Sequence, residues 1–136
     1  MTYQGKILVV DDEASIRDLF QSFFKEAGYD VFIAEGGQEA LVILELQDID
    51  VIFIDLKLFG MNGIDLCRRI HKTRPLSIIY AMTGWSALFE IDECREAGFD
   101  DYFEKPLDMD KLLLLVEQAF ERLERWKKRY KTIKKL

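Results

Sequence analysis

Short apolar runs alternate along the chain with stretches in which apolar residues recur every three or four positions. Strands are predicted for the short runs, which are Lys6–Val10, Tyr29–Ala34, Val51–Ile54, Leu76–Met82 and Asp101–Phe103. Helices are predicted for Ala14–Ala27, Gln38–Leu46, Ile64–Lys72, Ala87–Ala97 and a long segment that starts after Pro106. Strands that are apolar throughout are typical of a sheet buried on both faces. The predicted fold class is therefore α/β, with a doubly wound, five-stranded parallel sheet.

Polar residues of specific types follow four of these strands. They are Asp11, Asp12 and Glu13 after the first strand, Asp55 after the third, Thr83 after the fourth and Lys105 after the fifth. Parallel strands end at one edge of the sheet, where α/β folds bind their ligands. Carboxylates that meet there suit Mg²⁺, while an ammonium and a hydroxyl group suit phosphoryl oxygens. Each residue alone could be an ordinary helix cap or loop residue, but together they predict phosphoryl transfer to an aspartate.

Seven short motifs resemble the response-regulator receiver family, in the family's order and across roughly residues 5–122. They are Ile7–Glu13, Gly37–Leu41, Asp50–Leu56, Met61–Gly63, Thr83-Gly84, Ala97–Tyr102 and Lys105–Leu107. The resemblance implies a flavodoxin-like (βα)5 fold, here with an extended C-terminal helix, and Mg²⁺ as the cofactor. It also implies a cytoplasmic switch of a two-component system, phosphorylated by the phosphohistidine of a sensor histidine kinase. Such a domain catalyses its own phosphorylation and dephosphorylation and is not an enzyme with a separate substrate.

The resemblance implies a role for each residue at the strand ends. Asp55 would accept the phosphoryl group, and Lys105 would bridge to that group, before a cis peptide bond at the following proline. Asp12 would bind Mg²⁺ directly and Asp11 through a water molecule, while Asp55 and the backbone carbonyl of Lys57 would complete the metal site.

Two further pairs of residues are implied to act around the phosphoryl group. Thr83 would swing toward it and Tyr102 would follow inward, which would switch the face formed by the fourth helix, the fifth strand and the fifth helix. Lys57 and Trp85 stand at positions that flank the path of attacking water in this family. We expect them to modulate hydrolysis and to prolong the phosphorylated state, although they could equally be tolerated loop residues. The family's frequent Met-Pro is replaced here by Leu58-Phe59, which touches no chemistry.

The predicted domains are residues 1–122, the receiver domain, and residues 123–136, a basic extension of the last helix. A heptad pattern runs along this helix through Leu112, Val116, Ala119, Leu123, Trp126, Tyr130 and Ile133. Residues 124–136 contain seven Lys or Arg and one acid, so their net charge is +6. Residues 1–123 carry a net charge of −12, which gives the whole chain its net charge of −6. Beyond Leu123, the receiver domain has no hydrophobic core left to cover Trp126, Tyr130 and Ile133. The extension is predicted to form a homodimeric coiled coil or a connector to an output domain, with a frayed tail as the alternative.

Several other functions are less well supported. No apolar run is long enough to span a membrane, and the basic extension alone is weak support for nucleic-acid binding. Cys67, Cys94 and the single His71 lack metal-ligand spacing, so the cysteines are expected to be buried, reduced thiols. The function could belong to the receiver portion of a longer regulator or hybrid kinase, acting on a downstream protein target. An aspartyl-phosphate phosphatase and a receiver that works without phosphorylation are the remaining alternatives.

Overall fold

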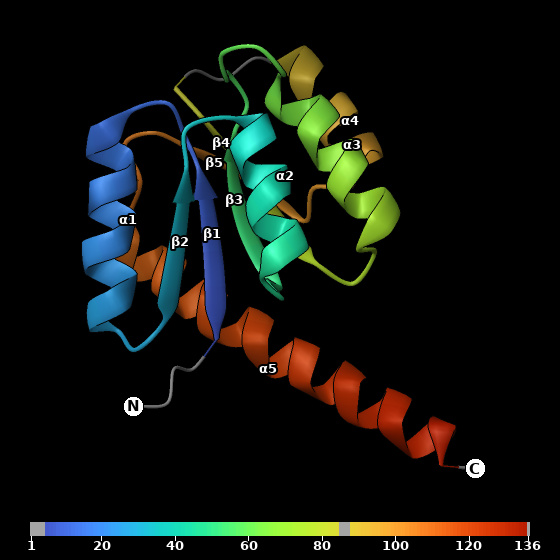
Figure 1. Cartoon of the computed structure of the whole chain (residues 1–136). Helices are drawn as coiled ribbons and strands as arrows, with labels where there is room; N and C mark the ends of the chain where they lie inside the picture. The colour runs from blue at the N-terminus through green and yellow to red at the C-terminus, as the bar shows by residue number, and fades with distance from the viewer. Residues whose placement is uncertain (1–4, 85–87, 136) are drawn as a thin grey trace.

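Strands and helices alternate along the chain as predicted (Figure 1). A computed structural model describes residues 5–84 and 88–135, and for residues 88–90 it describes the backbone alone. The strands are β1 (Lys6–Val10), β2 (Asp30–Ala34), β3 (Val51–Asp55), β4 (Ile78–Thr83) and β5 (Asp101–Glu104). The helices are α1 (Ala14–Glu26), α2 (Gly37–Leu46), α3 (Gly63–Thr73), α4 (Leu88–Ala97) and α5 (Met109–Lys134).

The five strands form one parallel sheet in the order β2-β1-β3-β4-β5. β1 lies between β2 and β3, so the chain changes direction across the sheet at β1. Such a change in strand order leaves a crevice at the carboxyl ends of the strands on either side of it. The doubly wound α/β fold with an extended C-terminal helix is confirmed.

Helices cover both faces of the sheet (Figure 1), with a hydrophobic core beneath them on each face. α1 and α5 pack on one face, where Phe20 and Phe24 of α1 meet Phe53 of β3. α2, α3 and α4 pack on the other face, through a core that includes Leu44, Leu66 and other buried residues. Successive residues of a strand point to opposite faces, so consecutive apolar residues of one strand fill both cores. This is why the central strands are apolar throughout.

The start of β4 differs from the prediction. β4 begins at Ile78, and Leu76 lies before it with 63% of its surface exposed. The backbone N–H of Ser77 donates to the carbonyl of Arg74 at 3.1 Å, which closes a turn through residues 74–77. The predicted strand began at Leu76 because Leu76 is apolar. The hydrogen bond that places Leu76 in a turn cannot be seen in the sequence pattern.

α5 is longer than the sheet that it covers. It begins at its cap Asp108, whose carboxylate accepts from the backbone N–H of Lys111 at 3.2 Å. Leu112, Val116, Ala119 and Leu123 are its buried residues, and their spacing carries the helix along the core. From Glu124 onward every described residue of the helix is exposed, and Figure 1 shows this part running past the lower end of the sheet.

The prediction for the two cysteines agrees with the structure. Cys67 and Cys94 are buried and not joined in a disulfide, and the thiol of Cys67 lies 3.6 Å from the carbonyl oxygen of Ala97. Within residues 5–84 and 88–135, no helix combines the length and the apolar character that crossing a membrane requires.

Candidate functional site

Four carboxylates meet at the carboxyl ends of β1 and β3. Asp11, Asp12, Glu13 and Asp55 each place one oxygen within 4.8 Å of the others. Asp11 and Asp55 are buried, with 0% and 5% of their surface exposed, whereas Asp12 and Glu13 face solvent. Two buried acids and two exposed acids thus form one oxygen-rich cluster that solvent reaches at Asp12 and Glu13.

The parallel register explains why these residues meet. Val10 pairs with Ile54 in the β1–β3 ladder, so the residues that follow in each strand, Asp11 and Asp55, emerge side by side. The backbone N–H of Asp11 still donates to Ala34 of β2 at 3.1 Å, so Asp11 is held as a continuation of the sheet. The side chain of Asp11 then accepts from the backbone N–H of Glu13 at 2.9 Å, which turns the chain into α1.

Lys105 faces this cluster from the end of β5. Its ammonium group lies 2.8 Å from Asp11, 3.4 Å from Asp55 and 3.5 Å from Glu13. Its backbone N–H donates to the carbonyl of Thr83 at 2.7 Å, which fixes the residue against β4. The peptide bond between Lys105 and Pro106 is cis, as the family resemblance implied. The strand-end residues predicted to converge are therefore adjacent in space.

Burial and charge control ionisation in the cluster. Burial, followed by the negative charge of Asp11, raises the pKa of Asp55 from its ordinary value of 3.8 to about 6. The backbone N–H of Lys57, 3.2 Å from the carboxylate, and the charge of Lys105 limit this rise. For Lys105, burial lowers the pKa, but its hydrogen bond to Asp11 and the three surrounding carboxylates outweigh burial, so the pKa is raised. Asp55 is thus an anion that gains from a neighbouring cation.

Replacing Asp55 by asparagine is expected to stabilise the metal-free protein above pH 6. Because the folded protein raises the pKa of Asp55 to about 6, ionisation of Asp55 destabilises the fold progressively as pH rises from about 4 to 6. We expect Asp55→Asn to raise the free energy of unfolding at pH 7.5 by roughly 2 kcal/mol, and by less than half of that at pH 4.5. Urea titrations in EDTA measure both values.

The control for this experiment is Asp18→Asn, at an exposed position of α1. It removes the same charge outside the cluster and is expected to change the free energy of unfolding by less than about 0.5 kcal/mol. Equal effects of the two substitutions at pH 7.5 would contradict the electrostatic strain assigned to Asp55.

The start of α3 packs tightly beneath Asp55. A Cβ atom on Gly63 would lie 2.8 Å from the Cα of Leu56 and collide with the carbonyl oxygen of Asp55. Asn62 caps the helix by accepting from the backbone N–H of Asp65 at 2.9 Å. The Met61–Gly63 motif therefore lets a helix begin directly against the backbone of the candidate phosphoacceptor.

The predicted switch and modulating residues are placed as follows. Thr83 ends β4 with 1% of its surface exposed, and Tyr102 on β5 is partly buried against the core formed with α2, α3 and α4. The side chain of Lys57 is exposed beside Asp55. Trp85 lies outside the described residues.

The sequence prediction missed Arg17 and gave Glu13 no role of its own. Glu13 was counted among the acids after the first strand; it is the N-cap of α1, but its carboxylate makes no capping hydrogen bond and joins the acidic cluster. Arg17, one turn into α1, donates to the backbone carbonyl of Asp11 at 2.9 Å and pairs with Glu35 at 3.4 Å. The run of three acids was a usable signal for Glu13, whereas nothing in the sequence points to Arg17.

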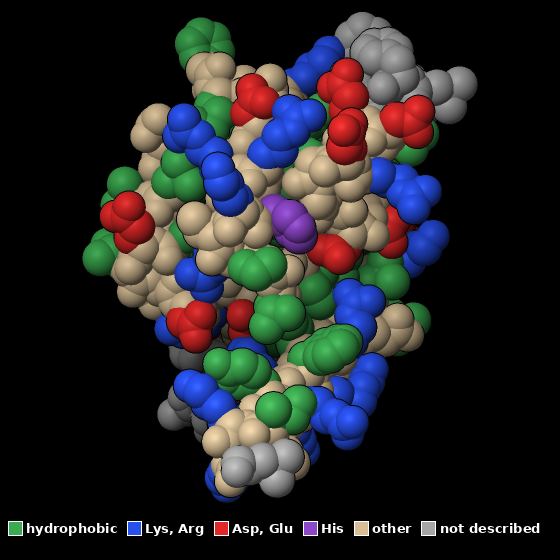
Figure 2. All heavy atoms as spheres, turned by 90° about the vertical axis from the view of Figure 1, so that its right-hand side faces the viewer, with side chains coloured by type: hydrophobic (Ala, Val, Ile, Leu, Met, Phe, Trp, Pro, Cys, Tyr) green, Lys and Arg blue, Asp and Glu red, His purple; other side chains and the backbone are tan. Residues whose placement is uncertain are grey.

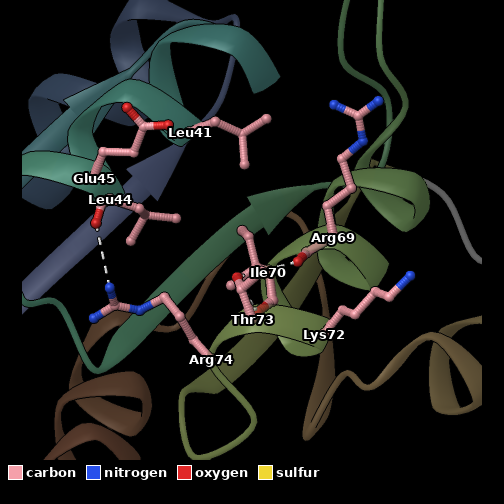
Figure 3. Close-up of a pocket in the computed structure, with 8 residues that line it drawn as sticks. All are labelled: Leu41, Leu44, Glu45, Arg69, Ile70, Lys72, Thr73 and Arg74. Atoms are coloured by element: carbon pink, nitrogen blue, oxygen red, sulfur yellow. Dashed lines mark hydrogen bonds between the residues drawn. The ribbon is translucent and has the colours of Figure 1, made fainter.

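A cavity of about 560 Å³ lies between α2 and α3, and its lining residues are drawn in Figure 3. Basic residues surround it, but the side chains of Arg69 and Lys72 point away from it. Arg74 donates to the carbonyls of Leu44 at 3.2 Å and Ile49 at 2.9 Å, and it also pairs with Asp48. The cations do not converge on the cavity, so its described lining offers no anion site.

Arg74 is expected to be important for stability. Arg74→Ala removes hydrogen bonds that join the end of α3 to the end of α2 and the loop before β3. We expect the free energy of unfolding to fall by about 2 kcal/mol, because two backbone carbonyls lose a charged donor. Lys72→Ala, at an exposed position of the same helix, is the control and is expected to cost less than about 0.5 kcal/mol. Indistinguishable urea midpoints for the two variants would contradict this role.

The chain is similar to known proteins. A family model described as the response regulator receiver domain matches residues 7–117. Sporulation initiation phosphotransferase F of Bacillus subtilis is 36% identical over 107 residues, which cover 79% of this chain and 86% of that protein. A cyclic di-GMP phosphodiesterase of Thermotoga maritima is 30% identical over 83% of this chain, and the match spans only 30% of that relative's length.

Solved structures agree with these matches. A CheY-like response regulator receiver domain protein from Methanospirillum hungatei superimposes with a TM-score of 0.85 at 30% identity, over 89% of this chain and 97% of that one. The BeF3-activated DrrB receiver domain gives a TM-score of 0.79 at 30% identity, over 86% of this chain and 97% of that domain. NtrX of Brucella abortus gives 0.85 at 28% identity, and the match covers 94% of this chain but 29% of NtrX.

Proposed function

This chain belongs to the response regulator receiver domain family, and we propose that Asp55 is the residue through which it takes part in phosphorelay signalling. One observation carries the proposal: a buried carboxylate, an ammonium group 3.4 Å from it and three more carboxylates share one strand-end site. Nucleophile and counter-charge are thus already adjacent before any phosphodonor arrives. Transfer of a phosphoryl group depends mainly on this kind of positioning and charge neutralisation.

Each residue has a distinct part in the proposed reaction. A carboxylate oxygen of Asp55 attacks phosphorus while the bond between phosphorus and the donor breaks, and the donor leaves with that electron pair. Lys105 neutralises charge on the phosphoryl oxygens. Thr83 follows Met82, which pairs with Asp55 in the β3–β4 ladder, and it would donate a hydrogen bond to the phosphoryl oxygens. Hydrolysis of the resulting acyl phosphate by water restores the Asp55 carboxylate and releases inorganic phosphate.

Mg²⁺ is the metal that we propose for the acidic cluster. The donor set consists of carboxylate oxygens, which suit a hard divalent cation, and neither of the two cysteines belongs to it. Asp11, Asp12 and Asp55 would hold the ion together with the backbone of Lys57, and Glu13 is placed to join them. When bound, the ion would neutralise phosphoryl oxygens and leave coordination positions for them.

The proposed partners follow from this chemistry. The donor that membership of the receiver family implies is the phosphohistidine of a sensor kinase. Such a donor explains why the described residues around Asp55 need no histidine; His71 lies against Gly98. Phosphorylation at Asp55 would shift Thr83 and Tyr102 and so alter the face of α4, β5 and α5. A downstream protein or an output domain would recognise that face.

Lys57 and Trp85 are proposed to set the lifetime of the phosphoryl group. We expect Lys57→Asn and Trp85→Ala each to accelerate dephosphorylation about tenfold, which corresponds to about 1.4 kcal/mol in the barrier, because both hinder the attacking water. Lys72→Asn, remote from the site, is the matched control for the lost charge. Loss of label after removal of the donor is the measurement, and unchanged lifetimes in both variants would contradict the proposal.

Incubation with acetyl phosphate and MgCl₂, or with EDTA in its place, tests the proposed function. We expect Mg²⁺-dependent labelling of the chain that outlasts removal of the donor. Rapid, continuous release of phosphate without stable label would instead favour an aspartyl-phosphate phosphatase. Absence of both label and turnover would favour a receiver that works without phosphorylation.

A further inference from the structure

The exposed end of α5 carries three large apolar side chains on one face. Trp126, Tyr130 and Ile133, here called the α5 stripe, have 60%, 61% and 60% of their surface exposed. They continue the face that begins with the buried Leu112 and ends with the buried Leu123. Figure 2 shows hydrophobic side chains gathered over the lower part of the molecule, toward the end of α5, with Lys and Arg beside them. Receiver packing does not account for this exposed apolar surface.

The α5 stripe lies in a corner between the helix and the lower rim of the sheet. Lys127 pairs with Asp50, just before β3, at 2.6 Å, which holds the helix against that rim. The carbonyl of Asp50 accepts from Ile78 at 2.7 Å, which brings the exposed Leu76 to the same rim. The stripe continues the side of α5 that faces the core, so the stripe faces the same way as the sheet and lies next to its lower rim. A second helix fits along such a corner, whereas a flat membrane surface cannot approach it closely.

The charges that flank the α5 stripe show which kind of helix fits. At about 100° per residue, Lys127 and Lys134 lie on one side of the stripe and Arg129 on the other. A symmetric pair of α5 helices would place these cations against the same cations of a second copy, in a parallel or an antiparallel arrangement. Like charges at these positions disfavour pairing, so the predicted homodimeric coiled coil is the less favourable use of this surface.

We propose that the α5 stripe is the docking surface for an amphipathic helix of another protein, with apolar residues at heptad spacing and Asp or Glu beside them. The apolar residues of that helix cover Trp126, Tyr130 and Ile133, and its acids pair with Arg129 and Lys134. This inference does not depend on phosphorylation of Asp55, so failure of one proposal leaves the other standing.

A designed peptide tests this surface on the full chain. The probe is a fluorescein-labelled helix of about three heptads with Leu at the core positions and Glu at the flanking positions, and its counterpart has Lys in place of Glu. In fluorescence anisotropy we expect the acidic peptide to bind at least about 10-fold more tightly than the basic one. Trp126→Ala with Tyr130→Ala should abolish this binding. Equal binding of the two peptides, or binding that survives the double substitution, would overturn the proposal.

A pair of charge-reversal variants separates a flanking contact from general attraction. Arg129→Glu combined with Lys134→Glu should weaken binding of the acidic peptide at least about 10-fold, because these two residues border the stripe. Lys128→Glu with Lys135→Glu makes the same change in net charge on the opposite side of the helix and should alter binding less than about threefold. Circular dichroism checks that α5 remains helical in all variants. Equal weakening by the two pairs would overturn the proposal.

The other occupants are outcomes of the same experiment. The unmodified chain could sediment as a dimer at the assay concentration and fail to bind the peptide. That result would assign the stripe to a second copy of the chain. Binding to phosphatidylglycerol vesicles without binding to the acidic peptide would assign it to a membrane surface. Either result would overturn the proposal.

Discussion

Asp55→Asn is expected to abolish labelling by acetyl phosphate. The substitution keeps the size of the side chain but replaces the attacking carboxylate oxygen, so no acyl phosphate forms. Intact-mass spectrometry after incubation with the donor and MgCl₂ measures the effect.

Asp18→Asn, exposed on α1, is the matched control and should be labelled at the same rate as the unmodified chain. Because Asp55→Asn is also expected to stabilise the fold above pH 6, loss of label in this variant cannot be assigned to unfolding. A variant at position 55 that still gained one phosphoryl group would place the acceptor elsewhere.

Lys105→Gln is expected to have the second largest effect. The substitution removes a cation that lies within 3.5 Å of Asp11, Asp55 and Glu13, so these carboxylates face one another without their counter-charge. We expect the rate of labelling to fall about 100-fold, the usual cost of losing one preorganised donor to developing negative charge. The pKa of Asp55 should rise further, because Lys105 is among the groups that lower it.

The comparison variant for Lys105 is Lys111→Gln, an exposed lysine in the first turn of α5. It removes one positive charge at a distance from the cluster and should leave the labelling rate unchanged. The time course of labelling at pH 7.5 and saturating MgCl₂ distinguishes the variants. Similar rates for Lys105→Gln and Lys111→Gln would contradict the role assigned to Lys105.

Much of this site could be predicted from the sequence because strand order and burial are simple constraints. Apolar strands must lie inside a parallel sheet, and their carboxyl ends must share one edge. This was enough to bring Asp11, Asp55 and Lys105 together, although 94 positions separate the first and last of them. The family resemblance added their chemical roles, which spacing alone does not supply.

Other features depended on contacts that periodicity cannot show. Leu76 was assigned to a strand, yet it lies in a turn closed by a backbone hydrogen bond to Arg74. Arg17 supports the acidic loop through a backbone carbonyl, a partner that leaves no mark on the sequence. The length of α5 was visible in its heptad pattern, but the corner beside it depends on the Lys127–Asp50 ion pair. Contacts between distant segments therefore account for most of what the sequence did not reveal.

The most direct test of the central claim is to locate the phosphoryl group on the chain. After labelling with acetyl phosphate and MgCl₂, reduction with borohydride converts a phosphorylated aspartate to homoserine, which tandem mass spectrometry assigns to one position. We predict homoserine at position 55, absent from the sample kept in EDTA. Modification at Asp11, Asp12 or Glu13 with position 55 intact would contradict the account.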